Sequence, residues 1–181
     1  MFPENTNNTN LFLIGMMGSW KSTVGRELAA TLGMEFIDTD DAIEEMTEMK
    51  IADIFREFDE KRFREMETAF FVEKAKQSGH VFSTGGGIVL SAENRKVLKE
   101  NGTTFLLDAF PKTLTDRIHN TSKRPLLIDS DNLEDRLKTI WNDRSELYIN
   151  CAHHVIKTDN LEPPRVLDEI LKILEVPIAD H

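Results

Sequence analysis

Residues 10–23 read NLFLIGMMGSWKST, and this stretch decides the fold. Residues 11–14 form a short apolar run typical of a buried strand, and a helical pattern of apolar residues begins directly after the stretch. Between them, residues 15–22 follow the pattern G-x-x-x-x-G-K-[ST] at every position except one. The stretch therefore predicts a strand, a phosphate-binding loop and a helix in succession.

The residue types of this loop suit the phosphates of a nucleotide. Glycines let backbone N–H groups turn inward around phosphate oxygens. Lys21 adds a positive charge, Ser22 offers a hydroxyl to Mg²⁺, and the helix N-terminus behind the loop adds the positive end of its dipole. We therefore expect six residues to contact a nucleotide: Gly18, Ser19, Trp20, Lys21, Ser22 and Thr23.

The one departure from the pattern is Trp20, which stands where the second glycine is expected. A glycine there permits a positive φ and leaves room for the backbone to approach phosphate. Holding a bulky residue in such a conformation costs about 1–3 kcal/mol. An indole beside the phosphates would also obstruct nucleotide binding, so Trp20 puts the ATP site in question.

Length and charge restrict the class of protein. A chain of 181 residues suits one domain, and its net charge of −10 argues against a nucleic-acid or anionic-membrane surface. The single cysteine excludes an intramolecular disulfide or a cysteine-rich metal site. Residues 1–9 resemble no signal peptide and predict a disordered leader, and no apolar segment approaches the ~20 residues of a membrane span. We therefore expect a cytoplasmic protein.

Strand-like and helical segments alternate along the rest of the chain. Strands are predicted at 34–37, 81–82, 103–107 and 154–156, and helical patterns at 24–32, 51–58, 61–76, 94–100, 112–120, 133–149 and 166–174. This alternation predicts a mainly parallel sheet covered by helices, which binds ligands at the carboxyl ends of its strands. The phosphate loop, the D-T-D of residues 38–40 and the glycines at 85–87 would meet at that rim.

Six motifs occur in one order: the phosphate loop, D-T-D at 38–40, FREME at 63–67, GGG at 85–87, RPLL at 124–127 and Arg144. With these motifs the chain resembles the shikimate kinases from about residue 11 to residue 174. The resemblance implies a three-layer α/β/α fold of the nucleoside-monophosphate-kinase type, with a five-stranded parallel sheet. It also implies one domain at 10–176, with a substrate-binding region at about 40–70 and a lid at about 120–132.

The activity that the resemblance implies is transfer of the ATP γ-phosphate to the 3-hydroxyl of shikimate, giving 3-phosphoshikimate and ADP in aromatic amino acid (chorismate) biosynthesis. Lys21 would bridge the phosphates, Ser22 and Asp38 would serve Mg²⁺, and Asp40 would bind the shikimate hydroxyls as a candidate base. Arg64 and Arg144 would clamp the carboxylate in a pocket lined by Gly85, Gly86 and Gly87. Arg124 would close on the phosphates as a catalytic lid residue, and Arg117 would lie on adenine.

Each of these residues also has a plainer interpretation. Asp38 and Asp40 could cap a helix, Arg64 could pair with Glu60 on a solvated helix, and Arg144 could pair with Glu134 or Asp143. The five histidines have no metal-ligand spacing, so no zinc site is predicted.

Three hypotheses stay open from the sequence. The first is an active, Mg²⁺-dependent, monomeric shikimate kinase whose partners are shikimate and ATP. The second is a non-catalytic shikimate-binding relative, or an altered form, in which Trp20 blocks ATP. The third is a kinase of another polyol acid such as gluconate, which the arginine pair with D-T-D disfavours.

Overall fold

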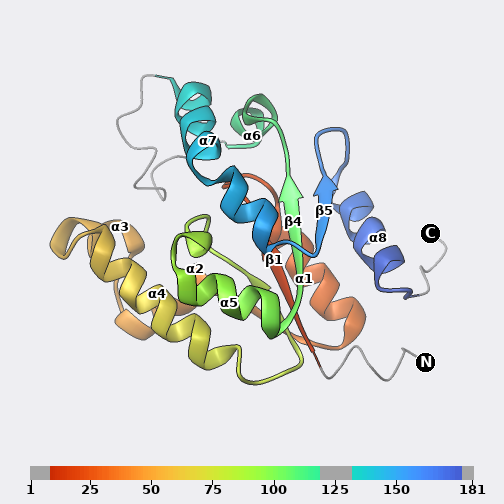
Figure 1. The fold of residues 1–181 in the computed structure, drawn as a ribbon, viewed down its shortest axis with the longest axis horizontal. Helices are drawn as coiled ribbons and strands as arrows, with labels where there is room; N and C mark the ends of the chain where they lie inside the picture. The colour runs from red at the N-terminus through yellow and green to blue at the C-terminus, as the bar shows by residue number, and fades with distance from the viewer. Residues whose placement is uncertain (1–8, 119–131, 177–181) are drawn as a thin grey trace.

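The protein, seen here as a computed structural model, is described over residues 9–118 and 132–176 (Figure 1). The predicted leader, apart from Thr9, and the predicted lid, apart from residue 132, lie outside these residues. Arg124 is therefore outside the described part of the chain.

A five-stranded sheet forms the centre of the fold, with all of its strands parallel. The strands stand in the order β2-β3-β1-β4-β5. Their bounds are β1 Asn10–Ile14, β2 Glu35–Asp38, β3 His80–Ser83, β4 Gly102–Asp108 and β5 His154–Lys157. The predicted α/β class and five-stranded parallel sheet are confirmed.

The central strand β1 explains why its sequence is a continuous apolar run. It pairs with β3 on one side and β4 on the other, and all five of its residues are buried. Strands covered on both faces need apolar side chains at successive positions. The strand ends at Ile14, so the phosphate loop begins at the carboxyl edge of the sheet.

Helices cover both faces of the sheet (Figure 1). On one face α1 (Lys21–Leu32) and α8 (Pro163–Ile173) share a core with residues of β1, β3, β4 and β5. On the other face α4 (Glu60–Lys74), α5 (Ala92–Glu100) and α7 (Leu133–Cys151) enclose a second core that contains Tyr148. The remaining helices are α2 (Thr39–Thr47), α3 (Ile51–Glu57), α6 (Pro111–Arg117) and the short η2 (Ile88–Leu90).

The helix α2 is the main element that the sequence did not predict. It begins one residue after the end of β2, and the Asp38 side chain accepts a hydrogen bond from the backbone N–H of Asp40 as its N-cap. The plainer interpretation of Asp38 as a helix cap is therefore correct, and it is compatible with a position in the site. Gly33 ends α1 with a φ of 67°, in the left-handed region that suits a glycine after a helix.

A smaller difference concerns the end of one helix. The helix expected at 112–120 ends at Arg117, and Ile118 is already extended with a φ of −91° and a ψ of 94°. None of the described helices is long and apolar enough to cross a membrane.

Candidate functional site

A cavity of about 370 Å³ opens at the carboxyl ends of β1, β2 and β3. It is lined by most of the predicted site residues, namely Gly18, Trp20, Lys21, Ser22, Thr23, Asp38, Asp40, Arg64, Gly85, Gly86, Gly87, Arg117 and Arg144. Ser19 is buried in the loop and does not line the cavity. The structure thus brings the phosphate loop, the two aspartates, the glycine turn and three arginines to one place.

The phosphate loop has its cation and its hydroxyl in place. Lys21 is 8% exposed, and its Nζ donates to the Met16 carbonyl at 2.8 Å, inside the curve of the loop. The Ser22 hydroxyl donates to Asp38 Oδ2 at 2.6 Å and lies 3.0 Å from the Ser83 hydroxyl. The ends of β2 and β3 therefore supply oxygen atoms directly beside the loop.

Trp20 adopts the backbone conformation that the pattern reserves for glycine. Its φ is 68° and its ψ is 18°, in the left-handed region, and it serves as the N-cap residue of α1 without a side-chain cap. The half-buried indole packs beside the core between α1 and α8, and its ring lies 3.4 Å from the guanidinium carbon of Arg117. The loop therefore keeps its shape and places an indole in the wall of the cavity.

Two carboxylates approach each other across Gly85. A Cβ added to this glycine would lie 2.7 Å from an oxygen of Asp40 and 2.7 Å from an oxygen of Glu67. Burial, with the nearby charges of Glu67 and Asp38, raises the pKa of Asp40 to about 7, against the opposing effect of Lys21 and Arg64. Asp40 thus has the proton affinity of a general base that works near neutral pH.

Glu67 is the most deeply buried carboxylate of the site. It is 1% exposed, and its Oε1 has no hydrogen-bond partner within residues 9–118 and 132–176. Its Oε2 accepts a bond of 2.8 Å from Arg64, which also pairs with Glu60 at 3.2 Å. Burial raises the pKa of Glu67 although the Arg64 charge opposes the rise. The predicted surface pair of Arg64 with Glu60 exists, but Arg64 also faces the cavity.

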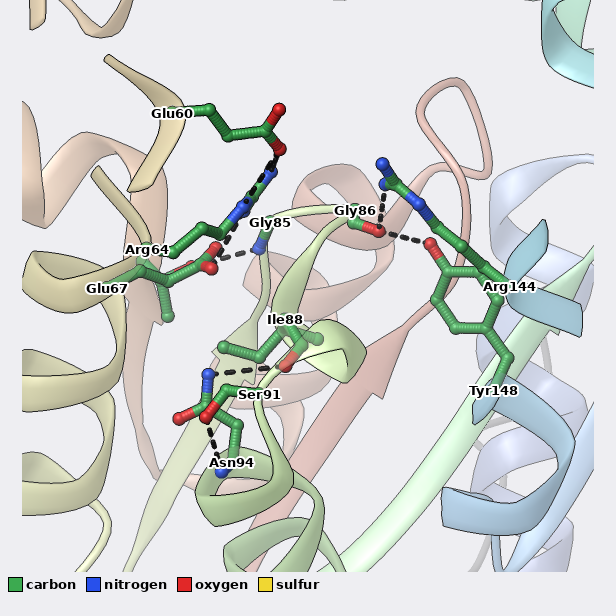
Figure 2. A network of polar contacts seen from close by, with 11 residues as sticks. Glu60, Arg64, Glu67, Gly85, Gly86, Ile88, Ser91, Asn94, Arg144 and Tyr148 are labelled. Carbon is green, nitrogen blue, oxygen red and sulfur yellow. Dashed lines mark hydrogen bonds and ion pairs between the residues drawn. The ribbon is translucent and has the colours of Figure 1, made fainter. Parts of the chain in front are cut away.

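The glycine turn is held by side chains from three helices, α2, α5 and α7, and Figure 2 shows those of α5 and α7. The Gly85 N–H donates to the Thr39 hydroxyl at 3.0 Å, and Asn94 donates to the Ile88 carbonyl at 3.2 Å. The Gly86 carbonyl accepts from Arg144 Nη1 at 3.2 Å and from the Tyr148 hydroxyl. Arg144 therefore points into the cavity, and no ion pair joins it to Glu134 or Asp143 among the described residues.

Several residues of the site carry no predicted role. Met17, Ile51, Phe55, Phe63, Ser83 and Thr84 also line the cavity. Ile51 and Phe55 of α3 and Phe63 of α4 form one apolar wall of the cavity. Ser83 and Thr84 directly precede the triple glycine, and this position at a strand end is the signal that could have identified them.

Comparison with known proteins identifies the family. The family model described as shikimate kinase matches residues 17–175. The chain belongs to the shikimate kinase family. A shikimate kinase of Thermodesulfovibrio yellowstonii is 40% identical over 166 residues, which cover 92% of this chain and 95% of that protein.

Solved structures of shikimate kinases agree in fold. The structure of the Acinetobacter baumannii shikimate kinase in complex with shikimate has a TM-score of 0.90 and 35% identity, and the match covers 94% of each chain. The structure of the Bacteroides thetaiotaomicron shikimate kinase has a TM-score of 0.85 and 30% identity, with coverage of 93% of this chain and 99% of that one. The described residues of this chain therefore have the fold of the shikimate kinases.

Proposed function

We propose that this protein transfers the γ-phosphoryl group of ATP to the 3-hydroxyl of shikimate, giving 3-phosphoshikimate and ADP. The observation that carries the proposal is a single cavity in which the phosphate loop faces Arg64 and Arg144. A planar guanidinium pairs with both oxygens of a carboxylate, so two arginines suit an acid as the phosphoryl acceptor. Membership of the shikimate kinase family favours shikimate over gluconate as that acid.

In this proposal the acceptor lies between the arginines and Asp40. Asp40 takes the proton of the 3-hydroxyl as the oxygen forms its bond to the γ-phosphorus, and the bond from that phosphorus to the bridging oxygen of ADP breaks. A pKa of about 7 lets Asp40 accept the proton near neutral pH. Gly85, Gly86 and Gly87 form the floor of the acceptor pocket.

The phosphate loop would bind the ATP, and the roles of its residues are part of this proposal. Lys21 would neutralise charge that gathers on the γ-phosphoryl oxygens in the transition state. Ser22 and Asp38 offer two oxygens that already lie 2.6 Å apart, so these two residues would hold Mg²⁺ beside the phosphate loop. When bound, Mg²⁺ would supply further positive charge to the phosphates. A closing role for Arg124 remains a prediction from the resemblance.

A second candidate function is supported by Trp20. A shikimate-binding protein that no longer takes ATP would keep the arginines and Asp40 while its indole obstructs the nucleotide. The left-handed backbone of Trp20 and its contact with Arg117 favour this alternative, because both place a large side chain beside the loop.

Calorimetric titration tests both candidates when shikimate and Mg²⁺-ATP are added separately, followed by a coupled assay for ADP release. Binding of both ligands with turnover would support the kinase. Binding of shikimate without ATP would support the second candidate, and no binding of shikimate would contradict both. The expected cytoplasmic location and monomeric state are part of the same proposal.

A further inference from the structure

Tyr148 contacts the acceptor side of the cavity without lining it. Tyr148 belongs to α7 and its side chain is fully buried. Its hydroxyl donates to the Gly86 carbonyl. Arg144 donates to the same carbonyl at 3.2 Å (Figure 2). The two donors stand four residues apart on one helix, so they project from the same face toward one acceptor.

The Tyr148 hydroxyl donates this bond from a buried position and also lies within hydrogen-bonding reach of Arg144. Its ring stacks on Trp141, with the centroids 6.0 Å apart and the planes at 15°, inside the core between the sheet and α7. Burial raises the pKa of Tyr148 to about 12, so the hydroxyl keeps its proton over the pH range in which proteins work. The Gly86 carbonyl therefore has a permanent hydrogen-bond donor on the side that faces the core.

Arg144 differs from Tyr148 in its surroundings. It is only half-buried, it lines the cavity, and its bond to the carbonyl is longer than a strong charged hydrogen bond. A carbonyl oxygen has two lone pairs, so it can hold both donors or keep only one. A substrate carboxylate would compete with this carbonyl for the guanidinium of Arg144.

We propose that Tyr148 is a positioning residue: it keeps the Gly86 carbonyl hydrogen-bonded when Arg144 turns from that carbonyl to the carboxylate of the acceptor. The inference rests on the proposed function, because it needs an anionic acceptor. Gly86 is half-buried and lines the cavity, so without the tyrosine hydroxyl Arg144 would be the remaining side-chain donor to its carbonyl and would be held back there. Tyr148 thus acts through Arg144 and touches no reacting atom.

The first test is Tyr148→Phe, which removes one oxygen and keeps the ring. We expect the KM for shikimate to rise about fivefold to tenfold, because one hydrogen bond is lost. The KM for ATP should be unchanged. Ser91→Ala is the matched control, because it removes a hydroxyl that caps α5 just beyond the glycine turn and does not contact Gly86. The control should lower the melting temperature and leave both KM values unchanged.

A double-mutant cycle separates positioning from general packing. If Tyr148 acts through Arg144, the effect of Tyr148→Phe on shikimate affinity should disappear in an Arg144→Ala background. An effect of the same size in both backgrounds would overturn the inference, because the tyrosine would then act without the arginine.

A third measurement uses the unmodified protein and does not depend on turnover. Tyr148 is the only tyrosine of the chain, so ¹³Cζ-tyrosine labelling gives one NMR signal from this hydroxyl carbon. Shikimate should shift this signal as Arg144 leaves the shared carbonyl, and Mg²⁺-ATP alone should leave it in place. If calorimetry shows that shikimate binds but the NMR signal does not shift, the inference about Tyr148 is overturned and the proposed function stands. If shikimate does not bind, both are overturned.

Discussion

The guanidinium of Arg117 lies on the indole of Trp20, with its carbon 3.4 Å from the ring centroid. Arg117 is held there from the other side, since its two terminal nitrogens donate to the Thr158 hydroxyl at 3.0 Å and to the Thr158 carbonyl at 2.6 Å. The resemblance places adenine on Arg117, so in this chain an indole already occupies one face of the arginine. An adenine base would have to displace the indole or use the opposite face of the guanidinium.

We therefore expect Trp20→Gly to bind Mg²⁺-ATP about tenfold more tightly than the parent chain. The change removes the indole from the wall of the cavity and frees the face of Arg117 that the indole covers. Trp20→Phe is the matched control, because it keeps the strained position and an aromatic ring, and it should bind ATP as weakly as the parent chain. Calorimetric titration measures the Mg²⁺-ATP affinity of the parent chain and of both variants. Equal affinity of the glycine variant and the parent would mean that the loop accommodates the indole.

Arg144→Ala should raise the KM for shikimate about 100-fold and leave the nucleotide dissociation constant unchanged. Removing one side of a charged clamp costs about 2–3 kcal/mol, and Arg144 stands on the acceptor side of the cavity.

Arg136→Ala is its matched control, since Arg136 is an exposed arginine two turns earlier on the same helix and does not line the cavity. Steady-state kinetics with either substrate varied should leave the control at parent values. A loss of shikimate and nucleotide binding together in Arg144→Ala would point to misfolding and contradict a role confined to the acceptor.

The sequence predicts the sheet well, because buried parallel strands leave a signal that needs no tertiary context. The predicted strand at 103–107 lies within β4, and the run at 11–14 lies within β1. The helix α2 is different: residues 39–47 read TDDAIEEMT, which contains little apolar periodicity. Its formation depends on the cap at Asp38 and on burial of Ile43 beside Ile54 and Phe63, contacts that only the folded chain supplies.

The residues of the site also differ in how far the sequence predicts them. Residues of continuous motifs, such as Lys21 and Ser22, are predictable because their chemistry depends on neighbours in the chain. Glu67 lies in the FREME motif at 63–67 without a predicted role, and Tyr148 lies in none of the six motifs. The importance of both arises from which face of α4 and α7 meets the glycine turn. The spacings of Arg64 with Glu67 and of Arg144 with Tyr148 are the only local signals of these contacts.

The raised pKa of Asp40 predicts that pH affects stability and activity in opposite directions. A carboxyl with a folded pKa of about 7 binds its proton more tightly in the folded state than in the unfolded state, where the value is 3.8. Its contribution to stability is therefore complete below pH ~4 and is lost as the pH rises through ~7. The rate should instead rise over this range, because only the ionised carboxylate can act as the base.

Asp40→Asn tests both effects. The variant should match the parent in unfolding free energy near pH 4. Above pH 8 it should be the more stable of the two by about 2 kcal/mol, once partial exposure of the carboxyl is allowed for. Its turnover should fall about 10²–10⁴-fold. Asp143→Asn, an exposed aspartate of α7, is the control and should change neither profile. A melting temperature difference that is constant from pH 5 to pH 8.5 would rule out the raised pKa.

Gly87→Ala should weaken acceptor binding because it displaces Arg64. The φ of Gly87 is −100°, so alanine fits the backbone, but its Cβ would overlap the guanidinium of Arg64. The arginine would have to swing away from Glu67, so we expect the KM for shikimate to rise at least tenfold and the melting temperature to fall by a few degrees, about 1 kcal/mol. Gly86→Ala is the control for folding, because its Cβ would meet its nearest neighbour at an ordinary 3.7 Å and should leave the melting temperature unchanged. If Gly87→Ala kept the parent KM for shikimate, the observed position of Arg64 would not be the one that binds the acceptor.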